Sequence, residues 1–396
     1  MQYLWIGCLE SDEEFKKKAK KGYDLASAQV SQKNLIEGLE SVGNFSFDSV
    51  NGSVLPPYPV YEDKNVDEVV WSHKANSFDI SVSYKNIKYL NRLYCKKSMI
   101  KAADLWVKNR YSGNGLTVFV YSMRSAPMAT ACYIKRKIPE AKLILIITDL
   151  PQFMDLGENR IKKALKKIDW ITIKQMQRDF DGFVLYAAKM AEYLNIPSDK
   201  WILMEGSYDI SEQIMSVKEK KKAIMYSGKL DEQYGIKMLV DAFMSVQDSD
   251  IELWITGGGN TEGYIRECVK KDSRIKFYGF LPSRNDVLKL QQQASLLVNI
   301  RLPSEPASAY CFPSKLFEYM ATGTPVLSFK LEGIPSEYLD KLILIENETV
   351  SAVKSAIING LNMSSEERTI IGHKAQKYII EEKSKNKQCE RIMSFI

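Results

Sequence analysis

A lysine and a glutamate stand one helical turn apart in the segment Tyr310–Leu327, and this spacing predicts a binding site for a nucleoside diphosphate. Lys315 and Glu318 lie at the start of a predicted helix, directly after a loop that contains Pro313 and Ser314. A helix start favours phosphate because its free backbone N–H groups and its dipole attract anions. Lys315 would add positive charge, and the Glu318 carboxylate can accept hydrogen bonds from two neighbouring hydroxyls of a ribose.

Two glycine-containing turns follow other predicted strands and suit the same ligand. Gly228 permits close approach of the backbone, and Lys229 would hold negative charge beside it. The alternative for this pair is a turn glycine next to a solvated lysine. Gly257 and Gly258 resemble part of a phosphate-binding loop, although a tight turn between a strand and a helix explains them equally well.

Arg301 directly follows a predicted strand. Its guanidinium would either hold a diphosphate or brace its own loop by pairing with Glu305. Asp248 and Asp250, in contrast, precede a strand and so lie at the wrong edge of a sheet for this site. We interpret them as a surface turn and expect no metal ion there.

Composition narrows the class of protein. The 396 residues suggest two or three domains, and 45% apolar residues are enough for sizeable cores. A net charge of +6, without a pattern of basic and aromatic residues, argues against nucleic acid as a partner. Six scattered cysteines and only two histidines, His73 and His373, argue against a zinc site. We therefore expect buried thiols, structural or solvated histidines, no metal and no other cofactor.

One dense basic run, Lys16–Lys21, has two interpretations. It is either a solvated loop or helix face, or a contact with an anionic surface such as the inner membrane leaflet or a phosphorylated acceptor. Leu143–Ile147 is among the longest apolar runs, and the short apolar start Met1–Ile6 leads into acidic residues, so we expect neither a spanning helix nor a secretory signal. The expected location is the cytoplasm, with peripheral association with the inner face of the plasma membrane as the alternative.

Apolar runs and helical segments alternate in two blocks, which predicts two doubly wound α/β domains with parallel sheets. The strands predicted in the first block are Leu4–Cys8, Leu116–Tyr121, Leu143–Thr148, Trp170–Ile173 and Trp201–Glu205, and residues 183–194 are predicted as a helix. The strands predicted in the second block are 223–228, 251–256, 275–278, 294–300 and 325–329, and the helices are 236–246, 264–271, 284–292, 364–383 and 386–395. We expect domains at 1–206 and 207–385, a linker within 207–222, and a ligand cleft between the domains at the strand ends.

Residues 223–340 resemble bacterial glycosyltransferases of family 4, which have two Rossmann-like domains (the GT-B fold) and act in capsule and exopolysaccharide assembly. The motifs that carry the resemblance are Tyr226-Ser-Gly-Lys-Leu230, Gly279-Phe-Leu281, Asn299-Ile-Arg301, Phe312–Pro325 and Glu332-Gly-Ile-Pro335. The segment Phe312–Pro325 is specific, whereas the glycine turns are not. The first half matches more loosely, at Thr148–Pro151 and the helix expected to end at Leu194. The resemblance also implies that the last helix, 386–396, packs back on the first domain.

The resemblance implies roles for individual residues. Glu318 would hold the ribose hydroxyls, and Lys229 and Lys315 would stabilise the diphosphate leaving group. The remaining implied contacts are the backbone N–H groups of Ser314 and Leu316 with the phosphates, and the side chains of Phe280 and Leu281 with the nucleobase.

This chain departs from the family pattern at three places. The family often has a second glutamate eight residues before Glu318, where this chain has Tyr310, and Glu305 is a carboxylate of the same loop that could substitute. The family's second basic residue, before a glycine, is replaced by Tyr234. A histidine frequent in the first domain corresponds to Ser122 or Arg124.

The resemblance implies a retaining hexosyltransferase that works without a metal ion. It would move a sugar from a nucleotide-diphosphate sugar, UDP-linked on family grounds, to a lipid-linked or polysaccharide acceptor in capsule, exopolysaccharide or O-antigen assembly. Two alternatives stay open. One is a non-catalytic GT-B subunit that binds nucleotide without turnover, which the residue Tyr310 suggests, and the other is a nucleotide-sugar epimerase of the same fold.

Overall fold

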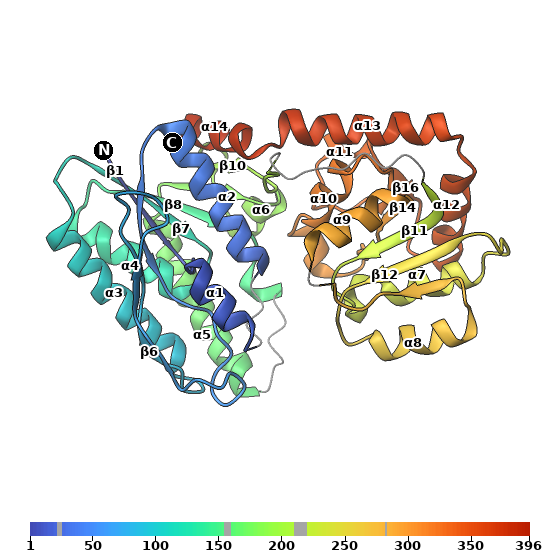
Figure 1. The fold of residues 1–396 in the computed structure, drawn as a ribbon. Helices are drawn as coiled ribbons and strands as arrows, with labels where there is room; N and C mark the ends of the chain where they lie inside the picture. Colours follow the sequence, from blue (N-terminus) through green and yellow to red (C-terminus); the bar gives the residue numbers. More distant parts are fainter. Residues whose placement is uncertain (22–25, 154–159, 210–219, 282) are drawn as a thin grey trace. The chain divides into compact units, whose positions relative to one another are not determined.

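The computed structural model describes residues 1–21, 26–153, 160–209, 220–281 and 283–396, and they form two compact units (Figure 1). Unit 1 comprises residues 1–186, 190–204 and 388–396, and unit 2 comprises residues 187–189 and 205–387. The chain thus enters unit 2 close to residue 206, and its last segment belongs to unit 1. Most of the predicted linker, residues 210–219, lies outside the described part of the chain.

Unit 1 contains an eight-stranded sheet in the order β10-β9-β8-β7-β1-β2-β5-β4. Its strands are β1 (Gln2–Gly7), β2 (Phe47–Asn51), β4 (Val69–Trp71), β5 (Asp79–Ser81), β7 (Leu116–Tyr121), β8 (Lys142–Ile147), β9 (Gly182–Leu185) and β10 (Trp201–Leu203). All neighbours are parallel except β4 and β5. A separate antiparallel pair joins β3 (Asn65–Val66) and β6 (Tyr84–Lys85).

Helices cover both faces of this sheet (Figure 1). The helices of unit 1 are α1 (Asp12–Ala19), α2 (Ala26–Gly43), α3 (Asn91–Asn109), α4 (Ser125–Lys137), α5 (Arg160–Met176), α6 (Lys189–Leu194) and the end of α14 (Lys385–Phe395). Phe119 of β7 packs on Trp5 of β1 in a cluster that includes Leu35 of α2 and Ile392 of α14. Because neighbouring residues of a strand point to opposite faces, a continuously apolar strand such as β7 needs a cover on each side.

Unit 2 contains a six-stranded, wholly parallel sheet in the order β13-β12-β11-β14-β15-β16. Its strands are β11 (Lys221–Ser227), β12 (Glu252–Thr256), β13 (Ile275–Phe277), β14 (Ala294–Asn299), β15 (Val326–Phe329) and β16 (Ile343–Ile345). The main helices are α7 (Ile236–Met244), α8 (Glu262–Lys271) and α12 (Val350–Asn362) on one face, and α9 (Arg284–Gln293), α10 (Lys315–Ala321) and α13 (Ser365–Glu382) on the other (Figure 1). The short helix α11 (Ser336–Leu339) follows β15. The predicted fold class, doubly wound α/β with two Rossmann-like domains, is confirmed.

One predicted strand is wrong. The segment Trp170–Ile173 lies inside helix α5, where Trp170 packs near Tyr193 of α6 and Ile173 is buried. A short apolar run alone does not separate a strand from one covered face of a helix.

One predicted helix is also wrong in its first half. Residues 183–185 belong to β9, which pairs with β8 and β10, and only Lys189–Leu194 is helical. Pairing within a fully buried sheet decided the conformation of this segment, because strand preference depends strongly on context.

His73 is a structural residue within unit 1. Its Nδ1 lies 2.7 Å from Asp79 Oδ2, and its Nε2 lies 2.9 Å from Glu40 Oε1. Burial alone would lower the pKa of His73, but the hydrogen bonds to Asp79 and Glu40 raise its pKa to about 9. The ring is therefore a protonated link between α2 and β5.

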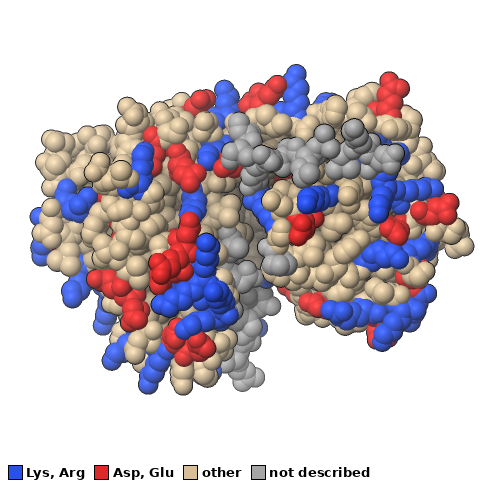
Figure 2. All heavy atoms as spheres, in the orientation of Figure 1, with Lys and Arg blue, Asp and Glu red and all other residues tan. Residues whose placement is uncertain are grey.

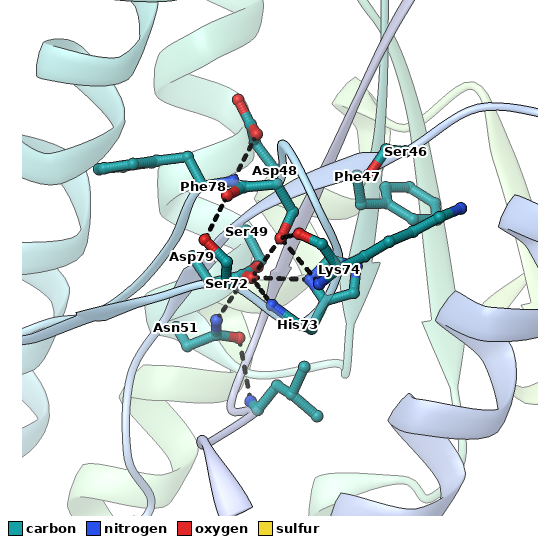
Figure 3. Close-up of polar contacts among 12 residues, drawn as sticks. Ser46, Phe47, Asp48, Ser49, Asn51, Ser72, His73, Lys74, Phe78 and Asp79 are labelled. Carbon is teal, nitrogen blue, oxygen red and sulfur yellow. Dashed lines mark hydrogen bonds and ion pairs between the residues drawn. The ribbon is translucent and has the colours of Figure 1, made fainter.

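A buried hydrogen-bond chain continues from Asp79 toward the carboxyl end of the sheet (Figure 3). The Ser49 hydroxyl donates to Asp79 Oδ1, and Asn51 Nδ2 donates to Ser49 Oγ at 2.7 Å. Asn51 Oδ1 then accepts the Leu9 N–H at 2.9 Å. This series of hydrogen bonds fixes the loop that follows β1 to the end of β2.

The basic run Lys16–Lys21 lies at the end of α1, and most of its charge is paired. The paired lysines are Lys17 with Glu14, Lys18 with Glu10, and Lys21 with Glu62 and Asp63. Lys18 is itself buried. Basic and acidic side chains accordingly intermingle where α1 reaches the surface (Figure 2).

All six cysteines are buried thiols, as predicted. Among the helices that the structure describes, none combines the length and apolar character that crossing a bilayer requires.

Candidate active site

Most of the predicted site residues gather where the parallel strands β11 and β14 of unit 2 end. These strands are neighbours in the sheet although β12 and β13 lie between them in the sequence, so the strand order reverses here. Open α/β sheets bind ligands beyond the carboxyl ends of the strands at such a reversal. Lys229 follows β11, and the loop from Arg301 to helix α10 follows β14.

A buried tyrosine fixes α10 against the end of β11. The Tyr319 hydroxyl accepts the N–H of Ser227 and donates to the Ser227 carbonyl oxygen, both at 2.8 Å. Burial raises the pKa of Tyr319, so its hydroxyl keeps its proton. Because Gly228 and Lys229 directly follow Ser227, this anchor brings them to the same edge as the first turn of α10.

Glycines allow the turns after β11, β12 and β13 to lie against one another. Gly257 has a φ of 140°, and a Cβ there would lie 1.8 Å from the carbonyl oxygen of Gly228. The Gly257 N–H donates to the Gly279 carbonyl at 2.9 Å, and the Leu230 N–H donates to the Gly258 carbonyl at 2.9 Å. The three turns thus form one hydrogen-bonded edge, and contact of Gly228, Gly257 and Gly258 with a ligand stays a prediction.

Glu318 is the centre of the polar contacts at this edge. Its Oε1 accepts from Gln291 Nε2 at 2.6 Å and from Lys315 Nζ at 3.2 Å, while its Oε2 lies 3.6 Å from Arg284. Burial alone would raise the pKa of Glu318, but Lys315, Gln291 and Arg284 together lower it. The side chain, 12% exposed, is therefore an ionised acceptor at neutral pH.

Two ammonium groups are accessible at this edge. The side chain of Lys315 is 46% exposed and that of Lys229 is 63% exposed. Lys229 Nζ lies 3.8 Å from Asp231 Oδ2, too far for a hydrogen bond. Lys229 can therefore approach an anion without giving up a hydrogen bond to Asp231, and Lys315 can approach one while it stays beside Glu318.

Arg301 lies over the ring of Tyr234, the residue that stands where the family has a basic side chain. Its guanidinium carbon is 5.6 Å from the ring centre, and its Nε donates to Ser308 Oγ at 3.1 Å. Within the described residues these contacts, rather than an ion pair with Glu305, hold the arginine. The positive charge of Arg301 thus lies beside the side chain of Tyr234.

The loop between β14 and α10 packs closely on the segment that follows β15. A Cβ at Gly333 would lie 2.2 Å from the Cys311 carbonyl oxygen, so glycine allows this approach. Glu305 and Tyr310 flank a short 3₁₀ turn, Pro306–Ala309, in this loop, and both are half-buried. Contact of either residue with a sugar stays a prediction.

The remaining predicted contacts lie at the same edge. Ser314 is the N-cap residue of α10, and the Leu316 N–H already donates to the Pro313 carbonyl at 2.8 Å, so this amide is engaged within the turn. After β13, Phe280 is 77% exposed and Leu281 is half-buried. An exposed ring at this place suits stacking on a planar group.

Sequence analysis missed two residues of α9 that contact Glu318. Gln291 is fully buried and follows the buried Leu288 by three residues, so it continues the covered face of the helix. A glutamine within an apolar stripe is a signal that could have identified it. Arg284, one exposed charge among many, gave no such signal.

A cavity of about 390 Å³ opens at the opposite, amino-terminal edge of the sheet. Two of its basic side chains are already paired, Lys222 with Asp248 and Arg274 with Asp272, each at 2.6 Å. Asp248 also accepts the N–H of Asp250, so the aspartates form a surface turn. The described residues include no group of three or more histidine, cysteine, aspartate or glutamate side chains arranged to hold a metal ion.

Comparison with known proteins agrees with this geometry. Residues 221–363 match the family of Glycosyl transferases group 1. No curated protein matches the chain in sequence. The fold is shared with sucrose-phosphate synthase of Thermosynechococcus elongatus (13% identity, TM-score 0.68, covering 100% of this chain and 98% of that one).

Two further structures with this fold contain UDP. Anabaena HepE in complex with UDP is 12% identical, with a TM-score of 0.64 and coverage of 100% of both chains. A mutant of Staphylococcus aureus TarM in complex with fondaparinux, alpha-GlcNAc-glycerol and UDP is 10% identical, with a TM-score of 0.61 and coverage of 100% and 99%. The chain has the GT-B fold that these structures share, and its residues 221–363 match the family of Glycosyl transferases group 1.

Proposed function

We propose that the protein transfers a sugar from a UDP-sugar to a glycan acceptor. The observation that carries the proposal is Glu318, a largely buried, ionised carboxylate beside Lys315 at the strand reversal of a group 1 domain. Such a carboxylate suits the paired hydroxyls of a ribose, and the accessible ammonium groups of Lys315 and Lys229 suit a diphosphate. The UDP in the HepE and TarM structures supports the same nucleotide here.

The cations of the site suit the departure of a nucleoside diphosphate. As the bond from the sugar to the diphosphate breaks, negative charge grows on the phosphate oxygens. Fixed cations that contact these oxygens more strongly in the transition state lower the barrier. Lys229, Lys315 and Arg301 supply three such charges, and we expect the reaction to run without a metal ion.

We further propose retention of configuration at the sugar carbon, on the resemblance to family 4. In such a site the acceptor attacks from the face that the diphosphate leaves, and the departing phosphate can take the acceptor's proton. A separate general base is then not required. The same resemblance supports a lipid-linked or polysaccharide acceptor in capsule, exopolysaccharide or O-antigen assembly, with the enzyme in the cytoplasm.

A lipid-linked acceptor calls for a membrane-facing surface, and we propose that unit 1 supplies it through α3 and α5 rather than through the paired lysines of α1. The exposed apolar residues of this α3–α5 surface are Tyr89, Leu90, Leu93, Leu165, Ile168 and Ile171. Arg92 of α3 lies 3.9 Å from Asp169 of α5, and α4 packs against both helices, with Lys96, Arg136 and Gln175 of the three helices lining one cavity of about 270 Å³. Exposed apolar residues flanked by lysines are typical of helices that lie on anionic bilayers.

The test of the proposed function is transfer from a panel of radiolabelled UDP-sugars to lipid-linked and polysaccharide acceptors. We expect transfer by the wild type, and a ~10²–10³-fold lower rate in Lys315→Ala and in Arg301→Ala because each variant lacks a charge opposite the leaving group. Lys270→Ala, an exposed lysine of α8, is the matched control and should transfer normally.

The same assay separates the alternatives. Undiminished transfer by Lys315→Ala would reject the assignment of the site. UDP binding without any product over all acceptors would favour the non-catalytic subunit, for which Tyr310 in place of a glutamate is the supporting observation. Conversion of the donor with no acceptor present would favour an epimerase.

A further inference from the structure

A fully buried glutamine stands directly behind Glu318. Gln291 Nε2 donates to Glu318 Oε1 at 2.6 Å and to Ser227 Oγ at 2.9 Å. The amide carbonyl oxygen of Gln291 is buried too, and no residue in the described part of the chain offers it a hydrogen bond.

The charge of Glu318 determines how this amide is turned. If the amide were reversed, its carbonyl oxygen would face the carboxylate, and two acceptors cannot form a hydrogen bond. The observed orientation therefore keeps the bond to Glu318 and leaves the Gln291 carbonyl without a partner. Unpartnered buried polar groups oppose folding and are rare. The Gln291 amide is therefore oriented by its hydrogen bond to Glu318, because the stability of the core alone would not favour an unpartnered carbonyl.

Gln291 is itself held in place from the sheet. Ser227, which receives its second hydrogen bond, ends β11 and is anchored on both its N–H and its carbonyl by the hydroxyl of Tyr319. The backbone carbonyl of Gln291 accepts from Thr324 Oγ1 at 3.2 Å. The glutamine is therefore a rigid support between the sheet and the carboxylate.

The two oxygens of Glu318 consequently differ. Oε1 accepts hydrogen bonds from Gln291 and Lys315. Oε2 lies 3.6 Å from the side chain of Arg284 and receives no hydrogen bond from the described residues. An ionised carboxylate has about four acceptor positions, so one oxygen can be fixed while the other stays available to hydroxyl groups.

We propose that Gln291 is a positioning residue, which holds Glu318 in one orientation so that the Oε2 atom of Glu318 binds the ribose hydroxyls of the nucleotide. This inference rests on the proposed function and assigns to Gln291 no contact with the ligand. A flexible carboxylate would lose conformational freedom on binding, and a support that fixes it beforehand removes that cost.

The experiment compares two nucleotides on matched variants by calorimetry. The probes are UDP and 2′,3′-dideoxy-UDP, which lacks both ribose hydroxyls. The test variant is Gln291→Met, which keeps the length of the side chain without the amide. The control is Gln292→Met, the adjacent buried glutamine of the same helix, whose Nε2 makes no hydrogen bond to any described residue.

We expect Gln291→Met to weaken UDP binding by about tenfold, since a hydrogen bond to a charged group is lost, and to leave binding of the dideoxy nucleotide unchanged. Gln292→Met should leave both affinities unchanged. In a Glu318→Gln background, Gln291→Met should have no further effect on UDP, because the carboxylate that it supports is gone.

The outcomes separate this inference from the proposed function. Equal weakening of both nucleotides, or no weakening of either, overturns the role of Gln291 while nucleotide binding stands. If the wild-type protein binds UDP and the dideoxy analogue equally, the role of Gln291 is also overturned, because Glu318 then does not bind the ribose hydroxyls. Wild-type protein that binds neither overturns the proposed function as well.

A second variant guards against a failure to fold. Gln291→Asn keeps a buried amide but withdraws it from Glu318 by one methylene group. It should show the same selective loss for UDP, and thermal melting of each variant confirms that the compared proteins are folded.

Discussion

At the scale of single residues, one loop brings a positive charge beside a neutral residue of another loop. The family resemblance implies a basic residue at 234, where this chain has a tyrosine. The structure places Arg301, from a different loop, over the ring of Tyr234. Arginine stacks on aromatic rings and stays protonated, so a positive charge lies beside position 234 although the residue there is neutral. Sequence comparison by position cannot detect such a contact.

His73 makes the stability of unit 1 depend on pH. Its pKa in the folded protein is about 9, above the ordinary value of 6.5, so its stabilising contribution is complete below about pH 6.5 and is lost as the pH rises through 9. We expect the free energy of unfolding to fall by on the order of 2 kcal/mol across this window. Denaturant melts of wild type and His73→Gln between pH 6 and pH 10 measure the effect, which should be absent in the variant.

The second histidine supplies the control for this measurement. His373 is exposed on α13 of unit 2, and His373→Gln should keep the wild-type slope. A slope that survives in His73→Gln would show that another group is responsible. Glu40 acts in the opposite pH range: burial would raise its pKa, but the bonds from His73 and the Phe47 N–H lower it, so its contribution disappears on acidification.

At the scale of secondary-structure elements, most of the second half of the chain was predictable, although β16 and α12 were missed, and the first half was predictable only in part. Strands such as β7, β11 and β12 are continuous apolar runs between turn residues, and their predicted bounds agree with the structure to within two residues. The errors fall at 170–173 and 183–185, where short apolar runs suit either conformation and neighbouring strands decide. The contact of Gln291 with Glu318 was not predicted for a related reason, since it joins residues that are distant in sequence.

The α3–α5 surface yields a prediction at the same scale. We expect the wild type to float with vesicles that contain phosphatidylglycerol and not with vesicles of phosphatidylcholine alone. Binding needs both the insertion of the exposed apolar side chains into the bilayer and the attraction of the neighbouring lysines to anionic headgroups. The variant Leu165→Ser/Ile168→Ser/Ile171→Ser should lose most of this binding. Flotation assays measure it.

Two controls sharpen the assignment of this surface. Ile370→Ser replaces an isoleucine of α13 that is 61% exposed, close to the 62% of Ile168, and should bind vesicles normally. Lys16→Ser/Lys20→Ser should also bind normally if α1 is not the membrane contact. Loss of vesicle binding in the lysine variant, with normal binding in the triple variant, would show that α1 is the membrane contact.

At the scale of the whole molecule, the chain passes between the units through segments that unit 2 holds together. Lys383 is buried and its Nζ lies 2.9 Å from Glu205 Oε1, at the point where the chain enters unit 2. The Tyr208 N–H donates to the Lys383 carbonyl at 2.9 Å, and the Lys385 N–H donates to the Tyr208 carbonyl at 2.8 Å. A buried ion pair of this kind is costly to break by removing one partner. The entering and leaving segments therefore stay together.

The end of α14 is part of the core of unit 1. Ile392 and Cys389 are fully buried there, and Arg391 donates to the Leu203 carbonyl at 3.1 Å. Ile392→Ala should lower the stability of unit 1 by about 2–5 kcal/mol, since it leaves a cavity in a packed core. A chain truncated after Ser384 should lose more.

Tryptophan fluorescence can follow unit 1 by itself in this experiment. Five of the six tryptophans belong to unit 1, and Trp254 is the one in unit 2, so a Trp254→Phe background reports unfolding of unit 1 alone. Ile370→Ala, on the exposed face of α13, is the control and should leave that transition in place. A truncated chain with an unchanged transition would show that α14 contributes nothing to unit 1.

The way the chain returns to unit 1 also sets an order of events during synthesis. The residues that complete the first core, 388–396, are translated only after all of unit 2 has been made. Until then the core cluster that contains Leu35 and Phe47 lacks the side chains of Cys389 and Ile392. A ribosome that stalls within the second half would release a first half unable to close, a ready target for chaperones and proteases.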